Sequence, residues 1–406
     1  MKRGGAFWLV WLTAGCAAGQ TFSQRGFLEA TGAFYPEAAP NDSAHAVGEA
    51  QFRYEAFWKP FAGLQFAGGI AARADSHWQT ARDGHFSWLD REPRRPAFAL
   101  RRLSASYTRG KLAVEAGRQF IRWGKTDVLN PTDRFAPRDF LGVVDTEVLG
   151  VAAVRATYGG QSDSLDLVCA PWFTPSRVPL FDQRWAVLPP GVAVLDLGAS
   201  YPGRAQFGAR WNHIGGPAEY SVSFYDGFNH LPLFDTAAGR YATEVAVRRF
   251  YPRLRMYGAD AAIPMRALTL KAEAGYFTSA SRQADDYLLY VIQLERQAGE
   301  WFFVGGYAGQ VVTEHRSAFQ FAPDRGLTRA FVARAGYTID TNRSLALETA
   351  VRQNGKGVWV KAEYSQALGG HWRATAAWTL LRGREDDFLG QYHRNSQGKL
   401  GLRYSF

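Results

Sequence analysis

Residues Gly48 to Trp58 read GEAQFRYEAFW, and polar and apolar side chains alternate through this stretch without a break. The polar residues that share one face of an extended chain are Glu49, Gln51, Arg53 and Glu55. A period of two residues predicts a β-strand with one polar and one apolar face. A strand of about ten residues is also long enough to cross a membrane at a tilt.

The same alternation recurs along the chain, for example in RAQFGARWN (204–212) and HWRATAAWTL (371–380). We expect eighteen strands, at 25–35, 46–58, 62–72, 98–108, 112–122, 148–158, 164–171, 204–213, 218–226, 255–263, 268–278, 287–296, 301–312, 328–339, 344–353, 358–366, 370–381 and 398–406. The segment 164–171 has the weakest pattern, and a barrel of sixteen strands is the alternative if it fails.

The connections between these strands alternate in length. Short ones such as Lys59–Phe61 and Arg109–Lys111 alternate with long ones at 36–45, 73–97, 123–147, 172–203, 227–254, 279–286, 313–327 and 382–397. Only NGKG, at 354–357, is short where a long loop is due. This rhythm predicts an all-β fold: a transmembrane, antiparallel, up-and-down β-barrel with short periplasmic turns and long outer loops.

The N-terminal residues predict export. MKRGGAFWLVWLTAGCAAGQ has two basic residues, an apolar core and then small residues, which is typical of a signal peptide at 1–19 followed by a barrel at 20–406. Lipidation at Cys16 is the alternative. Once the signal is removed, Cys169 is the only cysteine, so no intrachain disulfide is expected.

The last strand supports an outer-membrane location. GKLGLRYSF alternates and ends on Phe406, which resembles the C-terminal signal that the barrel-assembly machinery of bacteria recognises. Outer-membrane lipid and lipopolysaccharide are then the surroundings we expect. The formal charge of +10 does not indicate a nucleic-acid partner, because the arginines are spread along the whole chain.

Lipid cannot hydrogen-bond to side chains or to backbone edges, so the polar faces are expected to line the lumen. The basic residues assigned there are Arg53, Arg102, Arg204, Arg210, Lys271, Arg334, Arg352, Lys361, Arg373, Lys399 and Arg403; the acidic ones are Glu49, Glu55, Glu115, Glu219, Glu273, Glu348 and Glu363. The basic excess predicts a water-filled path that favours anions. The alternative is that the charges pair across strands, as Lys271 with Glu273 would. Side chains alone cannot fill so wide a barrel, so water or a loop must occupy the interior.

The long connection 123–147 is predicted to fold inward and narrow the lumen. It follows the stretch GRQFIRWGKTDVLNPTDRFAPRDF (117–140), in which Pro131 and Pro137 stiffen the path. The residues assigned to this constriction are Arg122, Trp123, Lys125, Asp127, Asp133, Arg134, Arg138 and Asp139. Their aspartates are suited to capping local turns and their arginines to pairing with carboxylates.

A calcium site at Asp127, Asp133 and Asp139, with Asn130, is the competing hypothesis for this connection. The six-residue spacing and the neighbouring arginines argue against it, and no cofactor is expected.

The stretch 117–140 resembles a segment that recurs in an uncharacterised outer-membrane family, domain of unknown function 1302. The resemblance lies in Gly117-Arg118-Gln119, Trp123-Gly124-Lys125, Asp127, Pro131, Asp133, Pro137 and Asp139. The chain is also broadly similar to alginate-export-type barrels, which are channels with arginine-rich lumens. These resemblances imply a porin-like or export-associated barrel, working beside an envelope transporter, and they name no substrate.

Three classes of function compete. The first is a porin-like channel for the passage or export of polar solutes, with anions favoured, and it needs no catalysis. The second is an outer-membrane enzyme such as a lipid hydrolase, but no histidine lies beside a nucleophile in a known signature. The third is a structural or adhesive barrel, or an accessory of an export system without an open pore. Aromatic residues such as Trp78, Trp88 and Trp172 in two long loops would serve that role.

Overall fold

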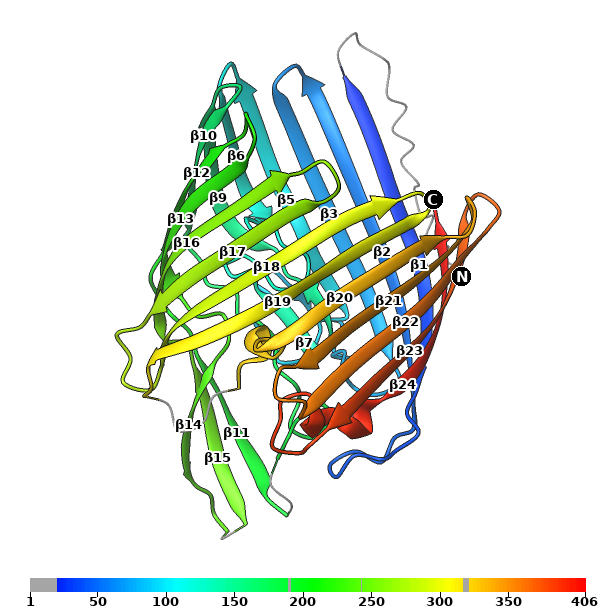
Figure 1. Cartoon of the computed structure of the whole chain (residues 1–406). Helices are drawn as coiled ribbons and strands as arrows, with labels where there is room; N and C mark the ends of the chain where they lie inside the picture. The colour runs from blue at the N-terminus through cyan, green and yellow to red at the C-terminus, as the bar shows by residue number, and fades with distance from the viewer. Residues whose placement is uncertain (1–19, 189–190, 242, 317–320) are drawn as a thin grey trace, which may run out of the picture.

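The computed structural model describes residues 20–188, 191–241, 243–316 and 321–406, so the signal peptide expected at 1–19 lies outside the described residues. These residues form a closed antiparallel barrel of eighteen strands (Figure 1). The strands are β1 (Thr21–Phe34), β2 (Ala46–Phe61), β3 (Leu64–Asp75), β5 (Phe98–Arg109), β6 (Leu112–Gln119), β9 (Val151–Gly159), β10 (Asp163–Ala170), β12 (Gln206–His213), β13 (Glu219–Phe228), β16 (Arg253–Pro264), β17 (Thr269–Thr278), β18 (Asp286–Ala298), β19 (Trp301–Glu314), β20 (Ala330–Thr338), β21 (Arg343–Arg352), β22 (Gly357–Leu368), β23 (Trp372–Gly383) and β24 (Gln397–Ser405). The predicted fold and strand count are confirmed, including the weak segment 164–171, which forms β10 between β9 and β12.

The barrel closes where the first strand pairs with the last. β1 and β24 are antiparallel from Phe27 opposite Ser405 to Phe34 opposite Gly398. One further pair extends this seam, because Gly26 N–H donates to the Phe406 carbonyl at 2.9 Å and Phe406 N–H donates to the Gly26 carbonyl at 3.0 Å. Gly26 leaves the space that the Phe406 ring fills, since a Cβ atom there would lie 2.5 Å from the ring. Both edges of the sheet are thereby satisfied.

The outward rows of the strands are apolar and exposed, as a lipid-facing surface requires. Leu103, Val222, Ile292, Leu347 and Leu400 are examples of large apolar side chains in these rows. Aromatic residues gather beside the short turns, where Trp58 stacks on Phe66 and Trp301 stacks on Phe303, each pair with ring centroids 5.5 Å apart. Trp211 and Trp372 lie at the same end of the barrel, and aromatic residues of this kind are typical of the membrane interface of such barrels.

The long connections contain secondary structure that the alternation did not predict. β11 (Ala193–Ser200), β14 (Leu233–Ala238) and β15 (Glu244–Phe250) form a small sheet that projects beyond the barrel (Figure 1). β7 (Arg138–Gly142) and β8 (Asp145–Val148) form a hairpin, β4 (Phe86–Ser87) adds to β5, and η1 (Pro323–Arg325) and η2 (Gly390–Asn395) are 3-10 turns. No helix in the described part of the chain is long and apolar enough to cross a membrane.

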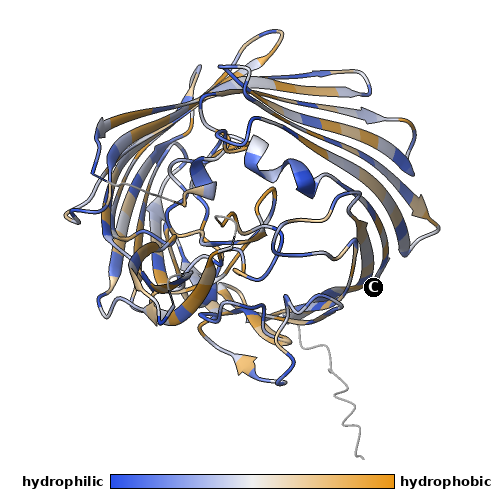
Figure 2. Ribbon diagram, turned by 90° about the horizontal axis from the view of Figure 1, so that it is seen from below, coloured by the Kyte–Doolittle hydropathy of each residue, from blue (hydrophilic) through white to orange (hydrophobic). Residues whose placement is uncertain are grey.

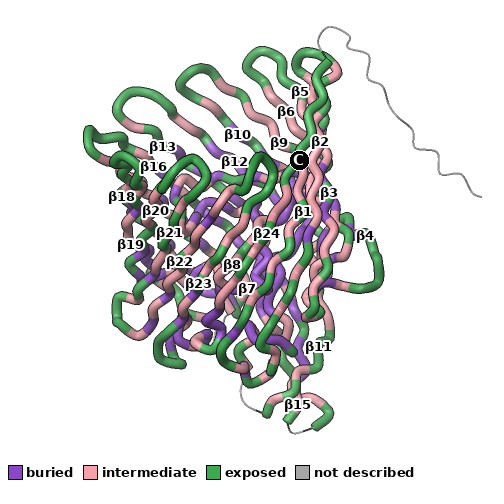
Figure 3. Tube along the Cα trace, turned by 90° about the vertical axis from the view of Figure 1, so that its right-hand side faces the viewer, coloured by how far each residue is buried: buried purple, intermediate pink, exposed green. Residues whose placement is uncertain are grey.

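Several of these connections fold back into the barrel rather than standing outside it. Figure 2, which views the end that carries the long connections, shows them crossing the interior. Buried segments gather in that half of the molecule (Figure 3). The residues of the larger buried cluster are Ile121, Trp123, Phe135, Val151, Ala153, Val168, Ala170, Tyr225, Leu254, Met256, Phe277, Tyr287 and Leu289. The inward rows are therefore charged only in part, and toward the outer end they are apolar and pack against the loops.

The two faces of a strand predict opposite tolerance to charge. Leu347→Arg places a cation on the lipid-facing row of β21 and is expected to destabilise the barrel by about 2–4 kcal/mol near the bilayer centre. Ala346→Arg, the neighbouring change on the lumen-facing row, is expected to cost much less. The free energy of unfolding in lipid vesicles, measured by urea titration, would contradict the assignment of faces if Ala346→Arg were the costlier change.

Candidate functional site

The connection 123–147 is attached to the inner wall of the barrel by Glu273 of β17. Glu273 Oε2 accepts hydrogen bonds from the backbone N–H of Lys125 (2.9 Å) and of Thr126 (3.2 Å), and from the Thr126 hydroxyl (2.9 Å). Its other oxygen accepts from the N–H and the hydroxyl of Thr132 at 2.8 and 2.9 Å. The Glu273 residue is only 1% exposed. A buried carboxylate with this many neutral donors stabilises one path of the loop across the wall.

Trp123 starts the inward path. Its backbone N–H and that of Gly124 donate to Asp133 Oδ1, so Asp133 caps the turn as the sequence predicts. The indole N–H donates to Asp166 Oδ2 of β10 at 3.0 Å. The Trp123 ring meets Phe135 edge to face, with centroids 5.3 Å apart. These contacts hold the loop against the wall formed by β10 and β12.

The far end of the connection contacts the opposite part of the wall. Asp145 pairs with Lys361 of β22 at 3.1 Å and with Lys399 of β24 at 3.8 Å. Burial acts to raise the pKa of Asp145, but the two ammonium groups outweigh it and the pKa is lowered. The connection thus runs through the interior of the barrel from β17 to β22 and β24.

Glu147 has three charged partners, one more than Asp145. Its carboxylate pairs with Arg53 of β2, Arg73 of β3 and Arg101 of β5. Burial acts to raise the pKa of Glu147, but the three guanidinium groups prevail and lower the pKa to about 2. At neutral pH this carboxylate is therefore fully ionised.

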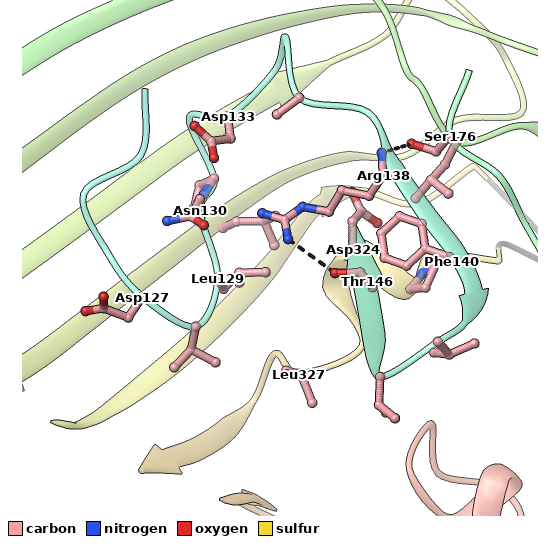
Figure 4. A pocket seen from close by; sticks show the side chains of 18 of the residues that line it. Asp127, Leu129, Asn130, Asp133, Arg138, Phe140, Thr146, Ser176, Asp324 and Leu327 are labelled. Carbon is pink, nitrogen blue, oxygen red and sulfur yellow. Dashed lines mark hydrogen bonds between the residues drawn. The ribbon is translucent and has the colours of Figure 1, made fainter. Parts of the chain in front are cut away.

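A cavity of about 260 Å³ lies between the connection and the wall. Figure 4 shows its lining, where Arg138 donates from Nη1 to the Thr146 hydroxyl at 3.3 Å and its backbone N–H donates to Ser176 Oγ at 2.9 Å. Its polar lining includes Asp127, Asn130, Asp133, Arg134, Arg138, Asp324, Arg334 and Glu348. Leu129, Phe140, Leu289 and Trp359 are among the apolar residues that line it. The cavity is thus lined by charged groups of both signs and by an apolar surface.

His230 also lines this cavity and joins two loops. Its Nδ1 lies 2.6 Å from the Thr174 carbonyl and its Nε2 lies 2.8 Å from the Arg134 carbonyl. Burial lowers the pKa of His230 to about 4, although both nitrogens face carbonyl oxygens. No sequence pattern indicates this role, because it depends on which loops meet.

Most of the basic residues assigned to the lumen lie on inward-facing rows of the barrel. These are Arg53, Arg102, Arg210, Lys271, Arg334, Arg352, Lys361, Arg373, Lys399 and Arg403. Many of them pair with carboxylates, as the alternative hypothesis held. Arg102 pairs with Glu115 at 3.1 Å, Arg352 with Asp387 at 2.9 Å and Arg403 with Glu29 at 2.8 Å.

Two details of the predicted pairing and placement are wrong. Lys271 pairs with Glu295 at 2.5 Å and with Asp127 at 3.4 Å. It does not pair with Glu273, because the Glu273 carboxylate accepts hydrogen bonds from the connection 123–147. Arg204 lies before β12 and is exposed. The pairing of β10 with β12 ends where Ala170 lies opposite Gln206. Arg204 therefore lies beyond the end of the sheet and is not part of the barrel wall.

Arg210 lies on the wall but not on the open path. Its Nη2 pairs with Asp260 Oδ2 at 2.8 Å, and the Arg210 residue is 4% exposed. Arg373 differs, since it is exposed and donates to the neutral hydroxyl of Ser365 at 2.8 Å. Charge exposed to a solute is therefore found near Arg373 rather than near Arg210.

The constriction residues assigned from sequence all lie on the inward connection or at its start, but they contact different partners. Lys125 reaches Glu219 at 3.3 Å, Asp127 reaches Lys271, Arg122 pairs with Asp133 at 3.3 Å and Arg134 lies 4.0 Å from Asp324. Asp139 pairs with Arg95 at 2.8 Å and with Arg177 at 3.3 Å.

The calcium alternative does not agree with these contacts. Asp127, Asp133 and Asp139 each belong to a separate network, so the fold does not bring the three carboxylates together. Within the described ranges, no group of three His, Cys, Asp or Glu residues could hold a metal ion.

Sequence reasoning missed several residues of the site, above all Arg101, Asp145 and Glu147. A β-bulge between β3 and β5 shifts the register at Gly69 and Ile70. Because of this bulge, two consecutive residues both point into the barrel: Arg101 pairs with Glu147 and Arg102 pairs with Glu115. Strict alternation would place only one of the two arginines inside.

Solved structures of similar shape identify the fold. A BenF-like porin from Pseudomonas fluorescens Pf-5 matches 97% of this chain over 100% of its own length, with a TM-score of 0.55 and 10% sequence identity. OccAB4 of Acinetobacter baumannii matches 94% of this chain and 98% of its own, at a TM-score of 0.54 and 10% identity. OpdQ of Pseudomonas aeruginosa matches 95% and 98%, at a TM-score of 0.54 and 9% identity.

The chain has the fold of the bacterial outer-membrane porins. Its apolar outer surface agrees with a location in the outer membrane. No family model and no curated protein match the sequence. The resemblance of residues 117–140 to domain of unknown function 1302 therefore stays a prediction.

The three-arginine contact predicts a pH dependence of stability. The pKa of Glu147 is lower in the folded barrel than its ordinary value near 4.5, so its contribution is present above pH 4.5 and is lost as the pH falls toward 2. Glu147→Gln leaves the three guanidinium groups without this carboxylate. At pH 6 the unfolding temperature of the wild type should be higher than that of Glu147→Gln, and this difference should vanish near pH 2. A difference that is constant from pH 6 to pH 2 would contradict the contact.

Proposed function

We propose that the chain is an outer-membrane channel for polar solutes, and that the inward connection 123–147 sets the size and charge of what passes. The observation that carries this proposal is the attachment of the connection to both sides of a closed barrel, at Glu273 and at Lys361 and Lys399. The attachment narrows the lumen but leaves the charged cavity beside it. No step in this function requires catalysis.

The cavity supports passage of small solutes that carry both polar and apolar groups. Its volume is at the lower limit of a pocket for a drug-sized molecule. The cavity lining carries both signs of charge. Its cations include Arg134, Arg138 and Arg334, and its anions include Asp127, Asp324 and Glu348. Selection at this point depends on the position of charged groups in the solute more than on its net charge.

A preference for anions is supported by the wall near the short turns. Arg373 is exposed and its partner is a neutral hydroxyl. Arg403, whose side chain is 40% exposed, donates from Nε and Nη2 to one oxygen of Glu29 at 3.0 and 2.8 Å, so its charge is only partly available. A guanidinium group without a carboxylate partner, such as that of Arg373, attracts anions in a water-filled path.

An accessory or adhesive barrel is the second candidate, and the projecting sheet of β11, β14 and β15 favours it. Trp78, Trp88 and Trp172 are exposed on the outer loops and would add aromatic contacts. The resemblance to domain of unknown function 1302 would suit such an accessory barrel beside an envelope transporter. Export of an acidic polysaccharide, which the similarity to alginate-export-type barrels suggests, would require a path wider than the cavity of about 260 Å³. In both cases the exposed Phe406 ring supports recognition by the assembly machinery, with lipopolysaccharide around the outer rim.

The channel proposal predicts a change in conductance when the connection is shortened. Deletion of residues 127–139 removes Thr132, one of the three residues of the connection that bond to Glu273, together with the chain that follows Thr126 into the lumen. It should raise single-channel conductance in a planar bilayer about two-fold or more, because the lumen widens. Deletion of residues 237–241, in the projecting sheet, is the control and should leave conductance unchanged. A wild-type barrel that carries no current, and stays silent after the first deletion, would favour the accessory or adhesive role.

The anion preference predicts a shift in reversal potential. Arg373→Glu combined with Arg403→Glu replaces two lumenal cations with anions, so selectivity should shift toward cations. Arg240→Glu reverses a single charge at the exposed tip of the projecting sheet and should have no effect. Reversal potentials measured across a salt gradient test this, and equal values for both variants would remove these residues from the path.

A further inference from the structure

A cluster of arginines lies where three long connections meet the inner wall of the barrel. Its guanidinium groups belong to Arg53, Arg73, Arg95, Arg101, Arg118 and Arg177. The carboxylates that pair with them are Glu49, Asp90, Asp139 and Glu147. Within ion-pair distance, six cations thus face four anions, which is an excess of positive charge, while Glu55 and Glu92 act on Arg101 and Arg118 only from farther away.

This excess is buried. The side chains of Arg118 and Arg177 are each 4% exposed, and Arg73, Arg95 and Arg101 are little more exposed. Burial lowers the pKa of Arg177 to about 9, with the neighbouring Arg73 as a further cause. A buried charge without a counter-ion is costly, so a compensating anion would stabilise the cluster.

The carboxylates present are already engaged. The two oxygens of Asp90 contact Arg177 and Arg118 separately, and the two oxygens of Glu147 are divided among Arg53, Arg101 and Arg73. They have no free oxygen to turn toward the remaining donors without breaking one of these pairs.

A small cavity lies inside the cluster and has donors without partners. Its volume is about 30 Å³, and its charged lining consists of Arg73, Arg95, Arg101, Arg118 and Arg177 together with the carboxylates of Asp90 and Glu147. Within the described residues, Nε of Arg118 and Nε of Arg177 are buried and have no hydrogen-bond partner. Buried N–H groups are almost always satisfied in folded proteins, so these two indicate a ligand.

We propose that this cavity binds one small monatomic anion, chloride under ordinary conditions, between the Nε groups of Arg118 and Arg177. The volume suits a ligand of about the size of a water molecule and excludes sulfate or an organic carboxylate. The anion joins β6, which carries Arg118, to the connection 172–203, which carries Arg177. It stabilises the packing of the long connections and is not a transported solute. The inference therefore stands whether or not the barrel conducts.

Thermal unfolding of the full chain in detergent tests the site. At equal ionic strength, the unfolding temperature of the wild type should rise by a few degrees and saturate as sodium chloride replaces sodium gluconate. Sodium sulfate should give no such rise. Arg118→Lys and Arg177→Lys each keep the positive charge but remove the Nε donor, and should abolish the chloride dependence. Arg343→Lys, at a short turn where Arg343 pairs with Asp340, is the matched control and should keep it.

Bromide provides a direct test on the wild type, which does not depend on any variant folding. Anomalous diffraction from crystals soaked in bromide should show a peak within hydrogen-bond distance of both Nε atoms. The proposal is overturned if the cavity has no peak. It is also overturned if a peak occurs but the unfolding temperature is equal in chloride and gluconate, because the result is then an adventitious ion only.

Discussion

The structure depends on one constraint: every backbone N–H and C=O group that crosses the membrane must find its partner within the protein. The pairing of β1 with β24 meets this constraint by closing the sheet, and Phe406 extends it by one residue at Gly26. A ring of eighteen strands is too wide for side chains alone to fill. The long connections fold into the interior for that reason, and the one at 123–147 crosses it.

Two kinds of contact hold this connection. At one end, Glu273 accepts hydrogen bonds from neutral backbone and hydroxyl groups, which fix the path of the chain from Lys125 to Thr132. At the other end, Asp145 and Glu147 pair with lysines and arginines of the wall. The first kind depends on geometry, and the second adds electrostatic attraction that is strong in a partly water-excluded interior. Together they make the inward path of the connection a fixed part of the fold rather than a loop lying over the opening.

Much of this fold could be predicted because a strand with one face in lipid and one in water has a simple pattern. Even the weak pattern at 164–171 corresponds to β10, and the inward direction of 123–147 follows from the width of the barrel. The errors lie where the position of a residue depends on the neighbouring strand rather than on its own alternation. The assignment of Arg204 to the wall is wrong because the partner strand β10 ends at Ala170, and Arg101 points inward because of a bulge between β3 and β5. The partners of Glu147 and the sheet of β11 and β15 depend on segments far apart in the sequence.

The most direct test of the account is amide hydrogen exchange of residues 123–147 in the folded barrel. The account predicts that the N–H groups of Thr126 and Thr132, which donate to the buried Glu273, exchange as slowly as those of β17 and β18. Exchange of these two amides as fast as at the exposed residue Tyr241 would contradict it, because the connection would then lie in solvent rather than against the inner wall.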